Sequence, residues 1–361
     1  MKVIIAGGGT GGHLFPAVAV GEAMMRARPD TEVLFVGTTA GLEARWMPRS
    51  GLRYELVDVH GLRGHGPIER LRAITEFALA LTRARRLLRS FGADLVVGAG
   101  GYASAPIAMC AIASRTPLVL MEQNMQVGLS NRMLWRFARK ICVGFEESKE
   151  LFEPSKVVVS GNPVRFKIEA SPVRPHQPLQ ILVLGGSSGA HRLNEGVIKA
   201  LRNLREDVIK LALVHQTGEA DVELVNGGYA ALQCPARVVP FIDDMASALA
   251  SADLIVARSG AMTVSEIALA GRPAVFVPYP FHRDRQQELN ARVLERVGAA
   301  IIVADDERLG ENLADALRGL TADPARLVRM GAAARTIAKP DAADTVARIC
   351  FELGAEERAA A

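Results

Sequence analysis

The chain contains two glycine-rich segments that each directly follow a short apolar run. GGGTGGHLFP spans 7–16 after the run 3–6, and GGSSGAHRLN spans 185–194 after the run 181–184. An offset of 178 residues aligns the two segments. Backbone amides in such turns, at the positive end of the helix that follows, are suited to holding diphosphates. The duplication therefore predicts two similar α/β halves, each with its own diphosphate cradle.

Short Val/Ile/Leu runs alternate with helical stretches along both halves, which is typical of parallel sheets covered by helices on both faces. The predicted fold class is α/β, with two Rossmann-like doubly wound domains. Residues 166–178 contain three prolines and little periodicity, so they read as a linker. The predicted strands are 33–37, 94–98, 117–121, 141–143 and 156–160 in the first half, and 180–185, 211–215, 237–240, 254–257, 274–278 and 300–304 in the second.

Composition narrows the class of protein. With 361 residues, 49 % of them apolar, the chain can build two cores. The sequence starts with Met-Lys and a predicted strand rather than with the long apolar segment (h-region) of a secretory signal peptide. This predicts a cytosolic protein. The net charge of +4 is too small to indicate nucleic acid, and four scattered cysteines favour buried thiols over disulfides or zinc. The uncharged window 95–114 is interrupted by glycines and a proline, so it predicts strand, turn and helix rather than a membrane span.

The first glycine segment allows several interpretations. Gly7, Gly9 and Gly12 satisfy GxGxxG, but the second strand ends Val36-Gly37-Thr38 with no acid to bind a ribose. A P-loop would need a lysine where His13 stands. What remains is an anion-binding turn with His13 at its mouth. That histidine is either a general base, because its ordinary pKa lies near neutrality, or a simple phosphate or capping contact.

Two other segments also carry alternatives. GAGGYASAP at 98–106 follows a strand of the same half, and it is either a tight strand-helix junction or a second ligand turn at the same sheet edge. The sequence from Thr263 to Glu266 fits a capping box, which alone would explain the glutamate. A carboxylate at a helix start can equally accept two ribose hydroxyls. The two diphosphate cradles predict a diphosphate donor and a diphosphate acceptor, which is the chemistry of a sugar transferase.

Seven motifs occur in the order and spacing of one bacterial family: GGGTGGHLFP, GAGGYASAP, EQN at 122–124, SGNPVR at 160–165, GGSSGA, RSGAMTVSE at 258–266 and DRQQELNA at 284–291. On these motifs the chain resembles, nearly end to end, the MurG family of UDP-N-acetylglucosamine:N-acetylmuramyl-(pentapeptide) pyrophosphoryl-undecaprenol N-acetylglucosamine transferases. The resemblance implies a GT-B fold, with an acceptor domain at 1–163, a donor domain at 164–340, a cleft between them, and a helix at 341–361 returning to the first domain.

The resemblance also implies the reaction and its partners. The C4 hydroxyl of MurNAc in lipid I would attack the anomeric carbon of UDP-GlcNAc with inversion, giving the β1,4 link of lipid II and UDP. No DxD triplet occurs in the chain, so neither a metal nor another cofactor is expected. The leaving UDP would then be stabilised by helix N-termini and backbone amides. Two departures from the family pattern are His191, where an arginine is expected, and Met262, where a leucine is expected.

Site residues follow from the resemblance position by position. His13 is the candidate base. The lipid I diphosphate would be cradled by Gly9, Gly12, Gly100, Gly101 and Tyr102. The predicted donor contacts are Thr10, Gly11, Gly12, Asn124, Arg165, Ser187, Ile242, Ala261, Met262, Thr263, Val264, Ser265, Glu266, Gln286 and Gln287, with Ser187 and Arg165 at the diphosphate, Ile242 at the uracil, Glu266 at the ribose, and Gln286 and Gln287 at the sugar.

A lipid-linked acceptor makes a membrane surface an expected partner. Residues 67–92 form a helical stretch with apolar and basic positions, and 135–140 add an aromatic-basic cluster. Peripheral docking on the anionic inner face of the bacterial cytoplasmic membrane is predicted, with other cell-wall enzymes as further partners. Alternatives are a UDP-GlcNAc 2-epimerase, another GT-B transferase, or a non-catalytic nucleotide-sugar binding scaffold. The apolar, basic and aromatic residues of the two segments predicted to dock on the membrane are Ile68, Leu71, Ile74, Phe77, Leu81, Leu88, Arg83, Arg85, Arg86, Arg89, Trp135, Arg136, Arg139 and Lys140.

Overall fold

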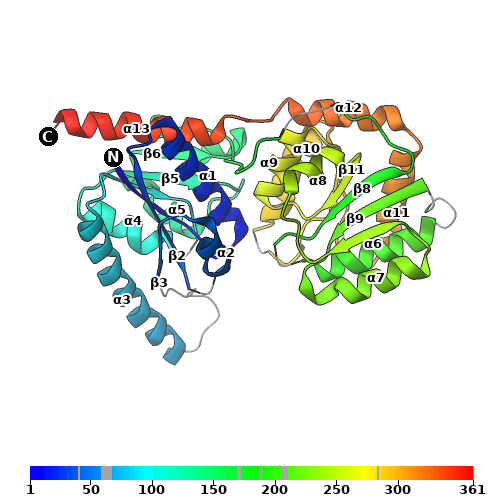
Figure 1. The fold of residues 1–361 in the computed structure, drawn as a ribbon, viewed down its shortest axis with the longest axis horizontal. Helices are drawn as coiled ribbons and strands as arrows, with labels where there is room; N and C mark the ends of the chain where they lie inside the picture. Colours follow the sequence, from blue (N-terminus) through cyan, green and yellow to red (C-terminus); the bar gives the residue numbers. More distant parts are fainter. Residues whose placement is uncertain are drawn as a thin grey trace. The chain divides into compact units, whose positions relative to one another are not determined.

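The chain forms two compact units, Met1–Arg165 with Pro340–Ala361, and Phe166–Lys339. The computed structural model describes residues 1–39, 41–57, 67–101, 103–168, 172–187, 189–204, 208, 210–282 and 284–360, and in helix α3 (Pro67–Phe91) it describes side chains from Thr75 onward. Figure 1 shows a sheet flanked by helices in each unit. The units meet in sequence two residues beyond the predicted boundary at 163.

A seven-stranded parallel sheet forms the centre of the first unit, in the order β3-β2-β1-β4-β5-β6-β7. Its strands are β1 (Lys2–Ala6), β2 (Glu32–Thr38), β3 (Tyr54–Val57), β4 (Leu95–Gly98), β5 (Leu118–Glu122), β6 (Lys140–Val143) and β7 (Val157–Val159). Besides α3, the helices and 3-10 turns are α1 (Gly11–Ala27), α2 (Glu43–Ser50), α4 (Ser104–Ala113), α5 (Leu129–Leu134), η1 (Trp135–Phe137), η2 (Glu146–Leu151) and α13 (Ala342–Ala360).

Alternating strand residues of this sheet fill two separate cores. Val3 and Ile5 face a core that α1 and α13 cover, whereas Ile4 and Ala6 face a core that α3 and α4 cover. This is the period-two pattern of a strand buried on both faces. Figure 1 shows α13 running beside α1, and Phe351 of α13 lies in their shared core. The last helix of the chain is therefore part of the first unit.

The second unit repeats this architecture with a six-stranded parallel sheet, in the order β10-β9-β8-β11-β12-β13. Its strands are β8 (Leu179–Leu184), β9 (Leu211–Gln216), β10 (Ala236–Val239), β11 (Leu254–Ala257), β12 (Ala274–Phe276) and β13 (Ala300–Ile302). Its helices and 3-10 turn are α6 (His191–Leu204), η4 (Glu219–Asp221), α7 (Val222–Ala231), α8 (Met245–Ser251), α9 (Ala261–Ala270), α10 (Gln286–Arg296), α11 (Leu309–Thr321) and α12 (Pro324–Arg335).

The predicted α/β class and every predicted strand are confirmed. Strand β3 was missed, because it is an edge strand in which only Val57 is buried and so has no clear apolar pattern. The predicted linker also contributes to packing, because Val173 is buried in the hydrophobic core of the second unit. Among the described helices, none is long and apolar enough to cross a membrane. Cys142, Cys234 and Cys350 are buried, and Cys110 is partly buried.

Candidate active site

Both sheets reverse their strand order at a central pair, β1 and β4 in the first unit and β8 and β11 in the second. Ligands of doubly wound sheets bind beyond the carboxyl ends of strands at such a switch point. The glycine segments at 7–12 and 98–101 follow β1 and β4, while those at 185–190 and 258–260 follow β8 and β11. The sequence motifs therefore lie at the ligand-binding edge of each sheet.

The two glycine turns of the first unit lie in direct contact. A Cβ on Gly101 would be 2.1 Å from the Gly8 carbonyl oxygen, and one on Gly7 would be 2.8 Å from the Ala99 Cβ. Gly101 also has φ +79°, a conformation that favours glycine. The structure thus brings together Gly100 and Gly101 with the His13 turn. Tyr102, also predicted there, lies outside the described residues.

His13 lies in the first turn of α1, next to Gly100. Its Nδ1 is 3.4 Å from the Thr10 hydroxyl, and a Cβ on Gly100 would be 3.1 Å from its Nε2. Burial lowers the pKa of His13, while a hydrogen bond from its ring to the Gly8 carbonyl and the negative charge of Glu43 raise it. A neutral imidazole that donates one N–H to a carbonyl has its other nitrogen available to accept a proton. His13 is therefore a candidate general base.

Gln123 provides an unpaired acceptor beside His13 that sequence reasoning did not assign. It is buried, and its Nε2 donates to the Ala99 carbonyl at 3.1 Å, which fixes the orientation of the amide. Its Oε1 has no partner and lies 3.7 Å from the ideal Cβ position of Gly100. Because buried acceptors are normally paired, this oxygen suits a ligand hydroxyl. The EQN motif was a signal, but only its asparagine had been assigned.

Glu43 was missed because it is not at the end of β2, where an acid was sought. It is the first residue of α2, and its buried carboxylate returns to accept the Thr38 amide and hydroxyl, both at 2.7 Å. Both carboxylate oxygens also accept the Gly9 amide at 2.9 Å. The amide of Gly9, which was predicted to bind a diphosphate, is thus paired with Glu43 in this structure. The amides of Gly11 and Gly12 donate to no acceptor in the described parts of the chain.

A second buried acid shapes the loop that carries Asn124. Glu122 accepts the amides of Gly128 at 2.8 Å and Asn124 at 3.1 Å, and the Asn131 side chain at 2.9 Å. Burial raises the pKa of Glu122, and these hydrogen bonds oppose the rise. Arg165 lies in the first unit, where its guanidinium stacks on Phe15 and Trp46 at 5.5 and 4.9 Å from the ring centroids.

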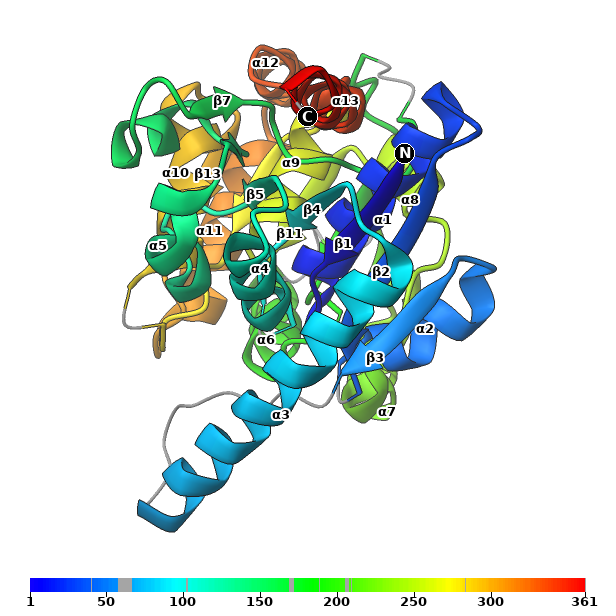
Figure 2. The ribbon, with the colours of Figure 1, turned by 90° about the vertical axis from the view of Figure 1, so that its left-hand side faces the viewer.

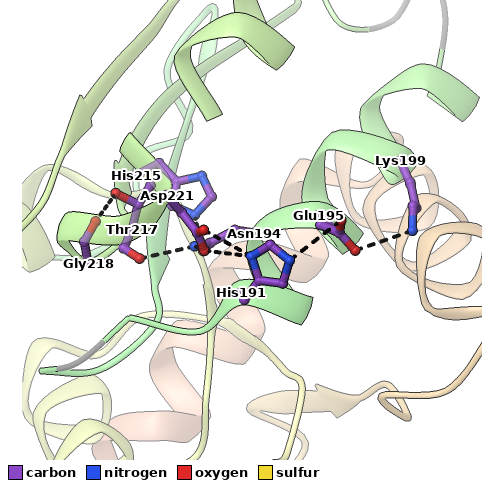
Figure 3. A network of polar contacts seen from close by, with 8 residues as sticks. All are labelled: His191, Asn194, Glu195, Lys199, His215, Thr217, Gly218 and Asp221. Carbon is purple, nitrogen blue, oxygen red and sulfur yellow. Dashed lines mark hydrogen bonds and ion pairs between the residues drawn. The ribbon is translucent and has the colours of Figure 1, made fainter. Parts of the chain in front are cut away.

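In the second unit, a polar network links the start of α6 to the end of β9 and to η4 (Figure 3). Asn194 donates from Nδ2 to the Thr217 carbonyl at 3.0 Å and to Asp221 at 2.8 Å. A Cβ on Gly189 would be 2.1 Å from that same carbonyl, so the turn packs directly on the end of β9. Ser187 is exposed on this turn.

His191 is the first residue of α6 and lies between two carboxylates in Figure 3. Its Nδ1 is 2.9 Å from Asp221, and its Nε2 is 3.7 Å from Glu195. The hydrogen bond to Asp221 raises the pKa of His191. His215, by contrast, is held neutral because burial lowers its pKa to about 3. The histidine that replaces the expected arginine therefore ties the start of α6 to η4.

Helix α9 begins three residues earlier than a capping box at Thr263 would require. Gly260 is its N-cap and no side chain caps it, so the predicted capping box is wrong. The first amides of the helix, those of Ala261, Met262 and Thr263, donate to no acceptor among the described residues. Val264 is fully buried and its amide donates to the Gly260 carbonyl. Its ligand contact stays a prediction. The Ser265 hydroxyl donates to the Ala261 carbonyl at 3.0 Å.

Glu266, one turn further along α9, has no hydrogen-bond or ion-pair partner among the described residues and is partly exposed. Burial raises its pKa from the ordinary 4.5 to about 8. An unpaired, poorly solvated carboxyl group with part of its surface open is a candidate to accept hydroxyl groups from a ligand, since perturbed pKa values cluster at functional sites.

The loop before α10 fixes the orientation of Gln287. Its Oε1 accepts the Tyr279 amide at 2.9 Å, which leaves its NH2 group as the donor toward a ligand. The Ser259 hydroxyl donates to the Gln287 carbonyl at 2.8 Å and so links this loop to the end of β11. Arg285, just before Gln286, has φ +49°, a strained conformation for a non-glycine residue. Ile242 is half-buried in the segment before α8.

Asp305 ties together several of these loops. Its buried carboxylate accepts Arg258 at 2.8 Å and Arg192 at 2.7 Å. Arg258 follows β11 and also donates to the carbonyls of Val277 and Pro278, and Arg192 is the second residue of α6. The Asp305 carboxylate, which follows β13, thus links the segments that follow β8, β11 and β12.

Comparisons with known proteins agree with this architecture. Residues 3–143 match the glycosyltransferase family 28 N-terminal domain and residues 180–346 match its C-terminal domain. A UDP-N-acetylglucosamine--N-acetylmuramyl-(pentapeptide) pyrophosphoryl-undecaprenol N-acetylglucosamine transferase of Geobacter sulfurreducens is 44 % identical over 352 residues, covering 96 % of this chain and 97 % of the relative. The chain belongs to the MurG family. A family member from Myxococcus xanthus is 42 % identical over 356 residues, covering 98 % and 93 % of the two chains.

Solved structures give the same result at the level of the fold. The crystal structure of Acinetobacter baumannii MurG has a TM-score of 0.79 at 33 % identity, covering 97 % of this chain and 99 % of that one. A putative UDP-N-acetylglucosamine 2-epimerase from Listeria monocytogenes has a TM-score of 0.70 at 14 % identity, covering 96 % and 94 %. At that identity the likeness shows the shared fold alone. The predicted GT-B fold is confirmed, and the comparisons favour the MurG family over the epimerases.

Proposed function

We propose that this chain transfers N-acetylglucosamine from UDP-GlcNAc to the C4 hydroxyl of MurNAc in lipid I, forming lipid II and UDP. The observation that carries the proposal is the 44 % identity to a transferase of that name over 96 % of the chain. The arrangement of both ligand-binding edges supports it, because each edge has glycine turns and unpaired helix amides suited to phosphate groups.

The second unit is the proposed donor site. The unpaired carboxyl group of Glu266 would accept the ribose hydroxyls, and Gln287 would donate to a hydroxyl of the sugar. The N-termini of α6 and α9 would stabilise the negative charge that develops on the leaving UDP. Contacts from Thr10, Gly11, Gly12, Asn124, Arg165, Ser187, Ile242, Ala261, Met262, Thr263, Ser265 and Gln286 remain predictions.

The first unit is the proposed acceptor site, with His13 as the general base. The oxygen of the C4 hydroxyl attacks the anomeric carbon and forms the new glycosidic bond. Its proton passes to the unprotonated ring nitrogen of His13, and the bond from the anomeric carbon to the UDP oxygen breaks. Attack opposite the leaving group inverts the anomeric centre and gives the β1,4 link. The unpaired amide of Gly12, with the turn at Gly100 and Gly101, would hold the lipid diphosphate.

A surface of the first unit is suited to peripheral docking on an anionic membrane. Helices α3, α4 and α5 pack in that order, and Figure 2 shows them on one side of the unit. Each basic side chain near an anionic leaflet contributes on the order of 1 kcal/mol. The exposed apolar residues of this surface are Leu79, Met109, Leu129, Met133 and Phe137, and the exposed basic ones include Arg83, Arg85, Arg86, Arg89, Arg132, Arg136 and Arg139.

The aromatic-basic cluster differs in detail from the sequence prediction. Trp135 packs inward on Phe152 with ring centroids 5.9 Å apart, and Phe137 is the exposed aromatic side chain, 63 % accessible. Leu88, predicted on the apolar face, is buried in the unit's own core. The side chains of Ile68, Leu71 and Ile74 lie outside the described residues.

The function is tested by measuring UDP release from UDP-GlcNAc with and without a short-chain lipid I analogue. Release that depends on the analogue, with a disaccharide product, supports the transferase. Conversion of UDP-GlcNAc to its 2-epimer would support the epimerase instead, and binding without turnover would support a scaffold. His13→Ala should lower kcat and leave the donor KM nearly unchanged, whereas a near wild-type kcat would exclude His13 as the base.

Docking is tested separately by sedimentation with vesicles. Binding to vesicles that contain phosphatidylglycerol should exceed binding to neutral vesicles and should weaken with added salt. Equal binding to both, unaffected by salt, would contradict the electrostatic part of the proposal.

A further inference from the structure

We propose that Glu43 is a positioning residue for the reaction: its carboxylate replaces a ligand anion in the first half of the GGGTGG turn and so holds the His13 loop in its working conformation. The inference rests on the proposed function, because it assigns a role to a residue that supports the base.

The contacts of Glu43 converge on the turn from two directions. Its two oxygens accept the amide of Gly9, and one of them also accepts the amide and hydroxyl of Thr38 at the end of β2. The side chain is fully buried. Each of these partners donates its hydrogen bond to the carboxylate, so both oxygens of Glu43 act as acceptors. Glu43 therefore links the GGGTGG turn to β2 and α2.

Three glycines pack closely against the Glu43 side chain. A Cβ on Gly8 would lie 2.2 Å from Glu43 Oε1, one on Gly41 would lie 2.3 Å from Oε2, and one on Gly37 would lie 2.4 Å from Cγ. These distances leave no room for side chains at the three positions. The glycines of this region thus serve partly to admit an internal carboxylate, and only the later amides of the turn remain for a ligand.

The GGGTGG turn, which Glu43 holds in place, also contacts His13 directly. Gly8, adjacent to the amide that Glu43 holds, accepts the hydrogen bond from the His13 ring. Of the groups described around that ring, namely the Gly8 carbonyl, the Thr10 hydroxyl, Gln123 and Glu43, the last one carries the charge. Removing the charge of Glu43 should therefore lower the pKa of His13 as well as loosen the turn.

The principal test is Glu43→Gln in the full chain, assayed with UDP-GlcNAc and a short-chain lipid I analogue. Glutamine keeps the shape but places an NH2 group against a donor, so the turn must shift, and small misplacements of catalytic groups cost up to about 100-fold in rate. We expect kcat to fall about 10- to 100-fold, the donor KM to change less than twofold, and the acidic limb of the kcat-pH profile to move to lower pH. A purely structural role would not move that limb.

A matched control and a milder variant complete the test. Asp253→Asn removes another buried carboxylate that accepts three hydrogen bonds, at the amino end of β11 in the second unit. It should lower the thermal midpoint and leave kcat within twofold of wild type. Thr38→Val removes one hydrogen bond to Glu43 and should lower kcat in the same direction by a smaller factor. If Glu43→Gln does not fold, this variant decides the question.

The outcomes separate this inference from the proposed function. Wild-type turnover that does not depend on the lipid I analogue would reject the transferase function. If the wild type turns over normally but Glu43→Gln keeps its kcat and pH profile, the role of Glu43 alone is rejected. If Glu43→Gln is unfolded, an unchanged kcat and pH profile in Thr38→Val gives the same conclusion.

Discussion

Glu266→Gln tests the donor site most sharply, because the variant keeps the shape of the side chain and removes its charge. Burial raises the pKa of Glu266 to about 8 in the free protein. A carboxylate that accepts ribose hydroxyls must be ionised, so binding of UDP-GlcNAc to the wild type should weaken by up to about tenfold for each pH unit below 8. The glutamine variant has no such dependence.

The magnitude at high pH follows from the hydrogen bonds. A hydrogen bond to a charged group contributes about 1.5–3 kcal/mol, so at pH 8.5 the variant should bind UDP-GlcNAc about 10- to 100-fold more weakly than the wild type. At pH 6.5, where the wild-type carboxyl group is mostly protonated, the two proteins should bind similarly. Isothermal titration at both values, with Glu295→Gln on α10 as a control, measures the ratio. A ratio that stays constant between them would refute the reasoning.

The same variant makes an independent prediction about stability. The pKa of Glu266 is higher in the native state than in the unfolded chain, so the native state binds the proton more tightly. Wild-type stability should therefore decline as pH rises from about 4.5 to about 8. Because the side chain is partly exposed, we expect Glu266→Gln to be more stable at pH 8 by on the order of 2 kcal/mol in urea unfolding. A less stable variant at that pH would contradict the assignment.

Three further predictions concern other parts of the structure. Asp305→Asn should destabilise the chain by about 3–5 kcal/mol in urea unfolding, because it leaves the buried Arg258 guanidinium without a charged partner; a loss below 1 kcal/mol would contradict this. Gln123→Leu should lower kcat/KM for the lipid acceptor about tenfold with an unchanged donor KM, whereas an altered donor KM would argue for a general distortion. In the native protein a thiol reagent should label the partly buried Cys110 before Cys142 or Cys350; the reverse order would refute the described packing.

Periodicity was enough to predict the frame of this protein. Apolar runs such as 3–6 and 181–184 became the central strands, because a parallel strand buried on both faces must be apolar throughout. Glycines such as Gly101 marked turns, because close approach of two loops excludes a side chain there. The edge strand at Tyr54–Val57 escaped detection, since one buried residue gives no pattern.

The supporting residues could not be predicted in this way. Glu43 and Asp305 come from elements with no fixed spacing to the loops that they hold, so no local motif reveals them. The Thr263 capping box failed for a related reason: Gly260 begins the helix earlier, which places Thr263 inside the first turn. Likewise, whether an amide such as that of Gly9 is free depends on a partner 34 residues away. Sequence located the site, and tertiary contacts decide which of its groups are available.

The central claim is that this chain joins a donor sugar to a lipid-linked acceptor. Its most direct test is to incubate the purified full chain with UDP-GlcNAc and a short-chain lipid I analogue, and to quantify UDP and the lipid-linked product together. The account predicts equal amounts of UDP and a β1,4-linked disaccharide, neither of which forms without the analogue. UDP release at the same rate without the analogue, or no disaccharide with it, would contradict the account.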